Sequence, residues 1–377
     1  MRACWLVLDS VGCGGAPDAE EFGDAGADTL GHLFEREGLE LPHLASLGLY
    51  EIMRGHSPVV PEAVPLRAGA AACRMTERSL GKDTTTGHWE LAGLVLEQPF
   101  ATFERYPADF IAELEKRAGV KFLGNIAASG TEILERLGEE HCRTGMPILY
   151  TSADSVLQIA AHEEIFGLDR LLRLCEQARE LLDESGLRVG RVIARPFIGS
   201  SAEDFQRTPN RRDYSLLPPT TVLDELCAQG VRVIGVGKIS DIFAGRGLSE
   251  SHPTKSNAAG MGMVDRLWER CGDRDSLIVV NLVDFDMLYG HRRDPQGYAR
   301  ALREFDAWLG EWLPQVKAGD FLCITADHGN DPYHHGTDHT REQVPLLTLH
   351  SPAPLREGGD FTQVADLLRR FFLPAQA

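Results

Sequence analysis

Short apolar runs alternate along the chain with longer segments whose apolar residues recur at helical spacing. The β-rich runs predict buried strands at Ala3–Leu8, Ile148–Tyr150, Val189–Ala194, Val231–Val236, Leu277–Val283 and Phe321–Thr325. The helical spacing predicts helices at Phe110–Arg117, Leu168–Leu182, Val222–Ala228 and Tyr298–Leu313. Strands that alternate with helices indicate an α/β fold, with a mainly parallel sheet covered by helices on both faces.

A stretch rich in proline and arginine, at 196–220, interrupts this alternation. Its composition is that of a long connection between substructures, and such connections are often functional. The 377 residues are enough for two domains, or for one domain with a large insertion. We therefore expect a core domain formed by both ends of the chain, 1–96 and 218–377, and a smaller α/β domain inserted at 97–217.

The excess of acidic residues limits the kinds of molecule that the protein is expected to bind. Lysine and arginine number 38 against 56 aspartate and glutamate residues, which gives a formal net charge of -18. Nucleic acid and anionic membrane surfaces are therefore not expected as partners, because both need a basic surface. The longest apolar runs, such as 277–283, are also far too short to cross a bilayer. An acidic enzyme can still act on small phosphate esters if cations and a few basic residues gather in one cleft.

The cysteines and the N-terminus indicate the compartment. The eight cysteines are dispersed and form no C-x-x-C pair, so they are interpreted as buried thiols in a reducing compartment. The apolar run before Asp9 lacks a small-residue cleavage site and is interpreted as a first strand rather than a signal peptide. The cytoplasm is the simplest assignment.

Three of the predicted strands run directly into aspartate and histidine residues. The run at 3–8 ends at Asp9, the run at 277–283 leads into DFDMLYGH (284–291), and the run at 321–325 leads into ADHGNDPYHHGTDHT (326–340). Ligands of open α/β sheets gather beyond the carboxyl ends of the strands, so these segments can meet at one place. The candidate metal ligands are Asp9, Asp286, His291, Asp327, His328 and His339. This donor set favours Mn²⁺, Zn²⁺, Fe²⁺ or Mg²⁺, and a pair of such ions suits phosphoryl transfer.

A simpler interpretation exists for each of these residues by itself. A lone aspartate after a strand is usually a helix cap or a turn residue. The segment 327–340 differs because four histidines and three aspartates fall within fourteen residues, a density that turn chemistry does not require. We interpret Asp331, Asp338, His334 and His335 as supporting residues of the loop, and Asp306 as a solvated helix residue. Asp284 is the alternative to Asp286.

The segment SLGKDTTTGHWE (79–90) offers a nucleophile. A threonine hydroxyl needs a base or a metal to activate it, and a site with two metal ions provides that activation. Asp83 or Thr86 could equally cap the helix that follows. The spacing alone leaves Thr84, Thr85 and Thr86 open.

Nearly the whole chain resembles the phosphopentomutase family of the alkaline phosphatase superfamily, in collinear order. The blocks that carry the resemblance are DSVGCGGAPDA (9–19), GKDTTTGHWE (81–90), ASGTEIL (128–134), YTSADSVLQIAAHEE (150–164), GRVIARPF (190–197), RTPNRRDY (207–214), GKISDIF (237–243), NLVDFDMLYGHRRDPQGY (281–298), and TADHGNDP with GTDHTRE (325–342). The Asp–His–Gly motifs occur throughout the superfamily, whereas the blocks at 81–90, 150–164 and 281–294 are much more specific.

The resemblance implies an alkaline-phosphatase-like core with an inserted cap domain. It implies that the six candidate ligands hold two manganese ions and that Thr84 carries the phosphoryl group. It further implies that Ser152, Asp154, Arg191, Arg207 and Lys238 bind the pentose phosphate. The implied reaction interconverts ribose 1-phosphate and ribose 5-phosphate, or their 2-deoxyribose equivalents, through phosphothreonine and a sugar bisphosphate, with glucose 1,6-bisphosphate as an activator.

Three other functions stay open at this point. A phosphatase or phosphodiesterase would use the same metals with an accessible water, and the blocks at 150–164 and 207–214 disfavour it. A metal-dependent phosphoglycerate mutase would use a serine nucleophile, which the threonine-rich block disfavours. A scaffold that binds metal without catalysis would not need the nucleophile. The sequence does not decide the pentose preference, the physiological metal or the oligomeric state, for which a monomer is the default.

Overall fold

The computed structural model describes residues 1–152, 155–272 and 274–374. The chain divides into two compact units: unit 1 is Met1–Gln98 with Pro218–Ala377, and unit 2 is Pro99–Leu217. The expected boundary at 96/97 lies two residues from the observed one, and the boundary at 217/218 coincides with it. Both units contain a sheet flanked by helices, so the predicted α/β fold class is confirmed.

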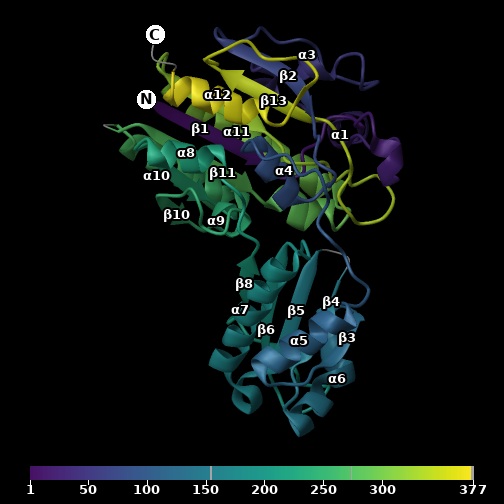
Figure 1. Ribbon diagram of the computed structural model, residues 1–377. Helices are drawn as coiled ribbons and strands as arrows, with labels where there is room; N and C mark the ends of the chain where they lie inside the picture. The colour runs from purple at the N-terminus through teal and green to yellow at the C-terminus, as the bar shows by residue number, and fades with distance from the viewer. Residues whose placement is uncertain (153–154, 273, 375–377) are drawn as a thin grey trace. The chain divides into compact units, whose positions relative to one another are not determined.

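The sheet of unit 1 is parallel through its centre (Figure 1). Its described strands, in order across the sheet, are β10 (Glu250–His252), β9 (Arg232–Val236), β11 (Ser276–Leu282), β1 (Arg2–Leu8), β12 (Asp320–Thr325), β13 (Val344–Leu349), β2 (Ala70–Thr76) and β14 (Gly359–Asp360). The five strands from β10 to β12 pair in parallel, whereas β13 runs antiparallel to both of its neighbours. The strand β1 therefore lies between β11 and β12, with all three running in the same direction.

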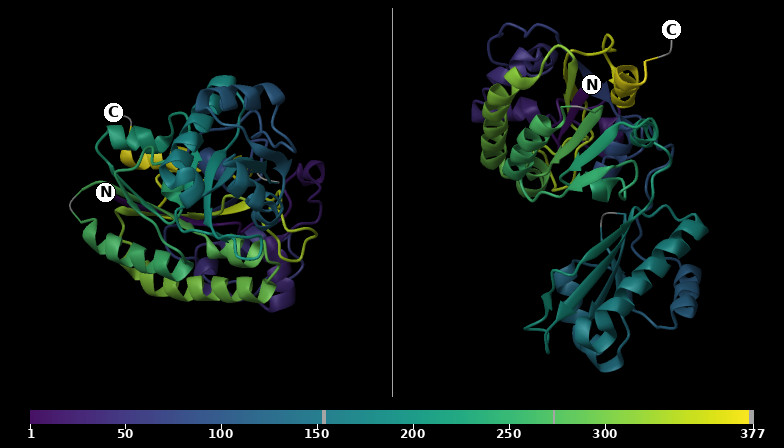
Figure 2. Two further views of the ribbon diagram at one scale, coloured as in Figure 1. Left: turned by 90° about the horizontal axis from the view of Figure 1, so that it is seen from below. Right: turned by 90° about the vertical axis from the view of Figure 1, so that its left-hand side faces the viewer.

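Helices cover both faces of this sheet, which explains why its central strands are predominantly apolar. Figure 2 shows α12 (Gln363–Phe372) on one side and the adjacent helices α10 (Asn257–Arg270) and α11 (Pro295–Trp312) on the other. Every residue of β11 and β12 is buried as a result. The remaining helices of unit 1 are α1 (Thr29–Glu37), α2 (Pro42–Ser46), α3 (Leu49–Met53), α4 (Thr84–Leu91), α8 (Val222–Ala228) and α9 (Ile239–Ile242), with short helices η1 (Ala19–Phe22), η3 (Phe285–Gly290) and η4 (Leu313–Gln315). No described helix is both long enough and apolar enough to cross a membrane.

Unit 2 has a mixed sheet with a separate apolar core on each face. Its strands are β3 (Leu123–Ala127), β4 (Ile148–Thr151), β5 (Val156–His162), β6 (Arg191–Ile198), β7 (Gln206–Arg207) and β8 (Arg212–Ser215). Alternate residues of the strands face α5 (Ala108–Ala118) and α7 (Leu168–Ser185) on one side. The other side packs against α6 (Gly130–Thr144), and η2 (Glu163–Gly167) follows β5.

Two interpretations from the sequence need correction. The stretch 196–220 was expected to be a long connection, but β6 extends to Ile198 and the stretch also contains β7 and β8. Asp306 was interpreted as solvated, but it is only 3% exposed. Its carboxylate accepts the backbone N–H groups of His43 and Leu44, at 3.2 and 2.8 Å, and so caps the N-terminus of the neighbouring helix α2.

Candidate metal centre and nucleophile

The carboxyl ends of three adjacent strands carry the predicted metal ligands. Asp9 follows β1, Asp286 lies in η3 beyond β11, and Asp327 and His328 follow β12. Because these strands are parallel neighbours, their carboxyl ends meet at one edge of the sheet. The backbone N–H of Asp9 donates to Leu282 O at 3.3 Å, which ties the first two of these ends together.

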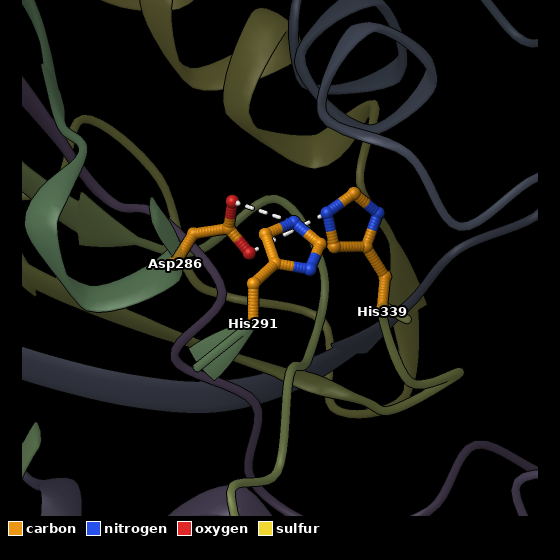
Figure 3. A group of neighbouring side chains, drawn as sticks. All are labelled: Asp286, His291 and His339. Atoms are coloured by element: carbon orange, nitrogen blue, oxygen red, sulfur yellow. Dashed lines mark ion pairs between the residues drawn. The ribbon is translucent and has the colours of Figure 1, made fainter. Parts of the chain in front are cut away.

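The structure gathers all six predicted ligands into two groups of three. One group is Asp9, Asp327 and His328, which are buried, and the other is Asp286, His291 and His339. Within each group, one potential ligand atom per residue lies within 4.8 Å of the others. Figure 3 shows the carboxylate of Asp286 facing both imidazoles: its oxygens lie 3.3 Å from His291 Nε2 and 3.4 Å from His339 Nε2.

The two groups adjoin each other through their imidazole rings. The ring centroids of His328 and His339 are 4.0 Å apart, and those of His339 and His291 are 4.8 Å apart. In the first group, His328 Nε2 lies 3.5 Å from Asp9 Oδ1 and 3.4 Å from Asp327 Oδ2. The arrangement therefore offers two neighbouring sites of mixed carboxylate and imidazole donors.

Burial and crowding of like charges shift the pKa values within the centre. Burial, with the carboxylates of Asp327 and Asp286 adding to it, raises the pKa of Asp9 to about 8. Burial opposes protonation of His339, but the carboxylate of Asp286 outweighs it and raises the pKa of that imidazole to about 9. Burial also opposes ionisation of Asp286 and Asp327, but the neighbouring histidines outweigh it and lower the pKa values of both carboxyl groups. A bound cation would supply compensating charge for the buried carboxylate of Asp9.

The unsatisfied atoms of the centre fit metal ligation. Asp9 Oδ1 and His339 Nε2 are buried and make no hydrogen bond within the described part of the chain. The buried Asp327 Oδ2 faces two imidazoles, at 3.0 Å from His88 Nδ1 and 3.4 Å from His328 Nε2. The opposite oxygen of each aspartate is bonded: Asn281 Nδ2 donates to Asp9 Oδ2 at 2.9 Å, and the N–H of Ser10 donates to Asp327 Oδ1 at 3.1 Å. Each carboxylate is thus held by one oxygen while the other points into the centre, as expected for metal-bound carboxylates.

The histidines are oriented in the same manner. The Nδ1 atom of His328 lies 3.0 Å from Gly329 O, and that of His291 lies 2.6 Å from Thr337 O. A ring whose Nδ1–H donates to a carbonyl presents an unprotonated Nε2 as a ligand. The donor set of nitrogen and oxygen suits Mn²⁺, Zn²⁺, Fe²⁺ or Mg²⁺.

Thr84 is the first residue of α4, and its hydroxyl lies beside the first group. Asp83 caps the helix, since its carboxylate accepts the N–H groups of Thr85 and Thr86. The hydroxyl of Thr86 donates to the same carboxylate, whereas Thr84 Oγ1 lies 3.2 Å from His328 Nε2. Asp83 is therefore the helix cap, and the adjacent Thr84, the predicted nucleophile, has a different partner in His328.

Of the predicted substrate-binding residues, Lys238 lies in unit 1 and the others belong to unit 2. Lys238 follows β9, and its positive charge opposes the rise in the pKa of Asp9 that burial causes. Ser152 follows β4, and Asp154 lies outside the described residues.

The two predicted arginines lie at opposite ends of strand β6 in unit 2. Arg191 begins β6, and its guanidinium lies 3.7 Å from the carboxylate of Asp213. Arg207 lies in β7, which pairs with the far end of β6. Its guanidinium packs against Gly130 at the start of α6, where any side chain would collide with it.

Several residues of the centre were not singled out from the sequence. His88 is fully buried, with Nδ1 2.9 Å from Thr84 O and 3.0 Å from Asp327 Oδ2. Asn281 and Asn330 each donate to a ligand carboxylate. His88 and Asn330 lie within the motif blocks, only four residues after Thr84 and two after His328, so proximity to a candidate residue is the signal that could have identified them.

Comparison with known proteins agrees with this architecture. The family model of the Metalloenzyme superfamily matches residues 1–373, and the chain belongs to that superfamily. Among solved structures, the chain is similar to the PH0037 protein from Pyrococcus horikoshii, with a TM-score of 0.51 at 14% identity, over 100% of this chain and 98% of that one. This likeness shows the fold alone.

Two weaker likenesses also extend over most of the chain. One is to phosphoglycerate mutase from Leishmania mexicana, with a TM-score of 0.46 at 14% identity, over 98% of this chain and 95% of that one. The other is to alkaline phosphatase from the Antarctic bacterium TAB5, with a TM-score of 0.35 at 10% identity, over 100% and 98% of the two chains.

Proposed function

We propose that this member of the Metalloenzyme superfamily is a phosphopentomutase, which interconverts ribose 1-phosphate and ribose 5-phosphate and accepts the 2-deoxyribose equivalents. The observation that carries the proposal is the position of Thr84, whose Oγ1 lies 3.2 Å from His328 Nε2 at the edge of a cluster of six potential metal ligands. The motif blocks around Thr84 and Asp286 support the same assignment, because they resemble the phosphopentomutase family.

The two groups of ligands would each hold one Mn²⁺ ion: Asp9, Asp327 and His328 one, and Asp286, His291 and His339 the other. When bound, the ions would neutralise the charge on the transferring phosphoryl group and lower the pKa of a nearby hydroxyl. Thr84 is the first residue of α4, so a phosphoryl group on its hydroxyl would lie at the positive end of the helix dipole.

The reaction would proceed in two balanced transfers from phosphorylated Thr84. The oxygen of the free sugar hydroxyl bonds to phosphorus as the bond from phosphorus to Thr84 Oγ1 breaks, and the hydroxyl proton ends on Oγ1. Thr84 Oγ1 then bonds to the other phosphorus of ribose 1,5-bisphosphate. The bond from that phosphorus to the sugar breaks, and the proton returns to the sugar oxygen. A sugar bisphosphate such as glucose 1,6-bisphosphate would prime the unphosphorylated enzyme.

Unit 2 would act as a cap that binds the pentose phosphate. Arg191 and Arg207 provide guanidinium groups for the phosphate, and Ser152 and Asp154 would orient sugar hydroxyls. Lys238 would contribute from unit 1. A closed site that excludes water would favour transfer to the sugar over hydrolysis. We propose the cytoplasm as the compartment of this enzyme, with a monomer as the default oligomeric state.

The test is an assay that measures isomer and free phosphate together. Purified protein is incubated with Mn²⁺, a catalytic amount of glucose 1,6-bisphosphate and ribose 5-phosphate. We expect ribose 1-phosphate with little free phosphate, and a phosphate group on Thr84 by peptide mass spectrometry. Free phosphate without isomer would overturn the proposal in favour of a phosphatase. Conversion of 3-phosphoglycerate instead would identify a phosphoglycerate mutase.

A further inference from the structure

Arg293 connects two loops that carry metal-ligand residues, although its own side chain is not among the candidate ligands. It lies two residues after His291, and its backbone φ is 52°, a left-handed conformation that residues with a side chain adopt only rarely. The side chain is half-buried, and burial lowers the pKa of its guanidinium. An unfavourable backbone conformation persists only where the surrounding contacts compensate for its cost, and the Arg293 side chain makes such contacts.

The guanidinium of Arg293 donates to oxygen atoms of three segments. Its Nη1 donates to Gly290 O at 2.9 Å and to Asn330 Oδ1 at 2.5 Å. Its Nε donates to Gly336 O at 2.6 Å, and its Nη2 donates to Asp338 O at 3.2 Å. The planar fork of an arginine can satisfy several acceptors in fixed directions, which the single ammonium of a lysine cannot do.

Three of these acceptors, in Gly290, Asn330 and Asp338, are directly linked to a ligand of the second group, which consists of Asp286, His291 and His339. Asn330 Nδ2 donates to Asp286 Oδ1 at 2.7 Å, so Arg293 fixes the amide that orients this carboxylate. Gly290 immediately precedes His291, and Asp338 immediately precedes His339. One side chain thus connects all three residues of the group drawn in Figure 3.

The backbone around Arg293 is shaped for these contacts. A side chain at Gly290 would come within 2.7 Å of Asn330 Cγ, so only glycine lets the asparagine approach this turn. Gly336, whose carbonyl oxygen accepts from Arg293 Nε, has a φ of 70°, a conformation that favours glycine. The first group is oriented by other residues, since Asn281 holds Asp9 and the backbone of Ser10 holds Asp327.

We propose that Arg293 is the positioning residue of one metal site only, the site formed by Asp286, His291 and His339. The inference rests on the proposed role of these residues as Mn²⁺ ligands. Partners that orient metal ligands typically contribute 10- to 100-fold to metal affinity. Loss of the Arg293 side chain should therefore weaken one of the two Mn²⁺ ions by about 10- to 100-fold and leave the other close to its original affinity.

The experiment measures Mn²⁺ binding to full-length protein from which metal has been removed by chelation. Equilibrium dialysis gives the number of ions bound and their affinities, and electron paramagnetic resonance distinguishes a coupled pair of ions from a single ion. The variants are Arg293→Lys, which keeps the charge, and Arg293→Gly, which removes the side chain without backbone strain at positive φ. Arg292→Ala, a change at the exposed neighbouring arginine, is the matched control.

We expect two ions in the original protein and in Arg292→Ala, and one weakened ion with loss of the coupled signal in both Arg293 variants. The melting temperature of the metal-free proteins shows whether a variant is folded, and Arg293→Lys serves if Arg293→Gly is not. Unchanged binding in folded Arg293 variants, or equal weakening of both ions, would overturn the role of Arg293 alone. A failure of the original protein to bind Mn²⁺ would overturn the metal sites themselves, and the inference with them.

Discussion

Thr84 and Thr85 are identical in chemistry and differ in their surroundings. Only Thr84 Oγ1 lies beside His328, while Asp83 holds the backbone of Thr85. We expect Thr84→Ala to lower mutase activity by more than about a thousandfold, because removal of a nucleophile abolishes covalent transfer. Thr85→Ala should stay within a few-fold of the original enzyme. Retained activity and a phosphate on another residue in Thr84→Ala would show that the nucleophile lies elsewhere.

Arg341 forms ion pairs with Asp18 and Glu77, and the pair with Glu77 provides a test of stability because both of its side chains are buried. Its side chain is 1% exposed and contacts Glu77 Oε2 at 2.8 Å, and Glu77 is equally inaccessible. Arg341→Met would leave the carboxyl group of Glu77 buried without its partner. We expect a loss of about 3–5 kcal/mol in the free energy of unfolding, measured by urea denaturation.

The matched control for Arg341 is an exposed ion pair. Arg356 lies 3.2 Å from Asp366, and both side chains are more than 40% exposed. Arg356→Ala should cost less than about 1 kcal/mol, because solvent screens exposed pairs. If the two substitutions had similar effects, burial would not be the source of the stability that Arg341 provides. Adding Glu77→Leu to Arg341→Met should recover part of the loss, since no buried carboxyl group is then left without a partner.

The site residues that the sequence could predict either follow an apolar strand or lie in a segment dense in histidine and aspartate. The six candidate ligands follow apolar strands or lie in a loop crowded with histidine and aspartate, and the structure brings them together. Asn281 and Arg293 lie in the same motif block as Asp286 and His291, but their residue types do not reveal a role in the sequence, because that role depends on three-dimensional contacts. Asp306 was misjudged for the same reason: its partner, the N-terminus of α2, is more than 250 residues away in the sequence.

Strands and helices could be predicted where their burial produces a regular pattern of apolar residues in the sequence. The runs that form β1, β11 and β12 are predominantly apolar because helices cover both faces of the sheet. The antiparallel strands β2 and β13 were missed. The sequence of β2, AAACRMT, has few strand-favouring residues, and Pro345 lies within β13. Pairing with neighbours in the sheet determines these strands more than their own composition does.

The contact between α6 and the end of β5 predicts a pH dependence of unit 2. His141 in α6 is buried, its Nδ1 lies 2.6 Å from Met146 O, and its Nε2 accepts the N–H of His162 at 2.9 Å. The ring is therefore neutral. Burial lowers the pKa of His141 below its ordinary value of 6.5, and the neighbouring imidazole of His162 contributes to the same shift.

The sign of the effect follows from proton binding in the two states. Between the unfolded pKa, near 6.5, and the lower folded pKa, the unfolded chain binds more protons at His141 than the folded chain. Stability should therefore fall as the pH falls from 7 toward 5, by at most about 1.4 kcal/mol per pH unit from this group. Urea denaturation of His141→Gln should give a shallower pH dependence, because glutamine keeps both hydrogen bonds without a titrating group. His56→Gln, a change at an exposed histidine, should leave the slope almost unaltered.

The whole molecule is acidic, and its candidate metal ligands all belong to unit 1. With a formal charge of -18, the chain already carries excess negative charge. Three of its aspartates, Asp9, Asp286 and Asp327, converge with the ligand histidines only when the chain folds. Asp9 is separated from the other two ligand segments by most of the chain, and the three segments are assembled by β1, β11 and β12. A preformed site of this kind exists only in the folded state, so binding of a cation and folding of unit 1 are linked.

Removal of metal should therefore destabilise unit 1 selectively. At 100 times its Kd, a metal ion that binds only the folded state contributes about 2.7 kcal/mol, which corresponds to roughly 5–10 °C in melting temperature for a unit of this size. Hydrogen exchange with and without a chelator should show lost protection in β11 and β12, and little change in β5 of unit 2. Readdition of Mn²⁺ should restore it, and Asp286→Asn should reduce the response. Equal loss of protection in both units would mean that their folding is coupled, and no loss in either would contradict metal binding at the centre.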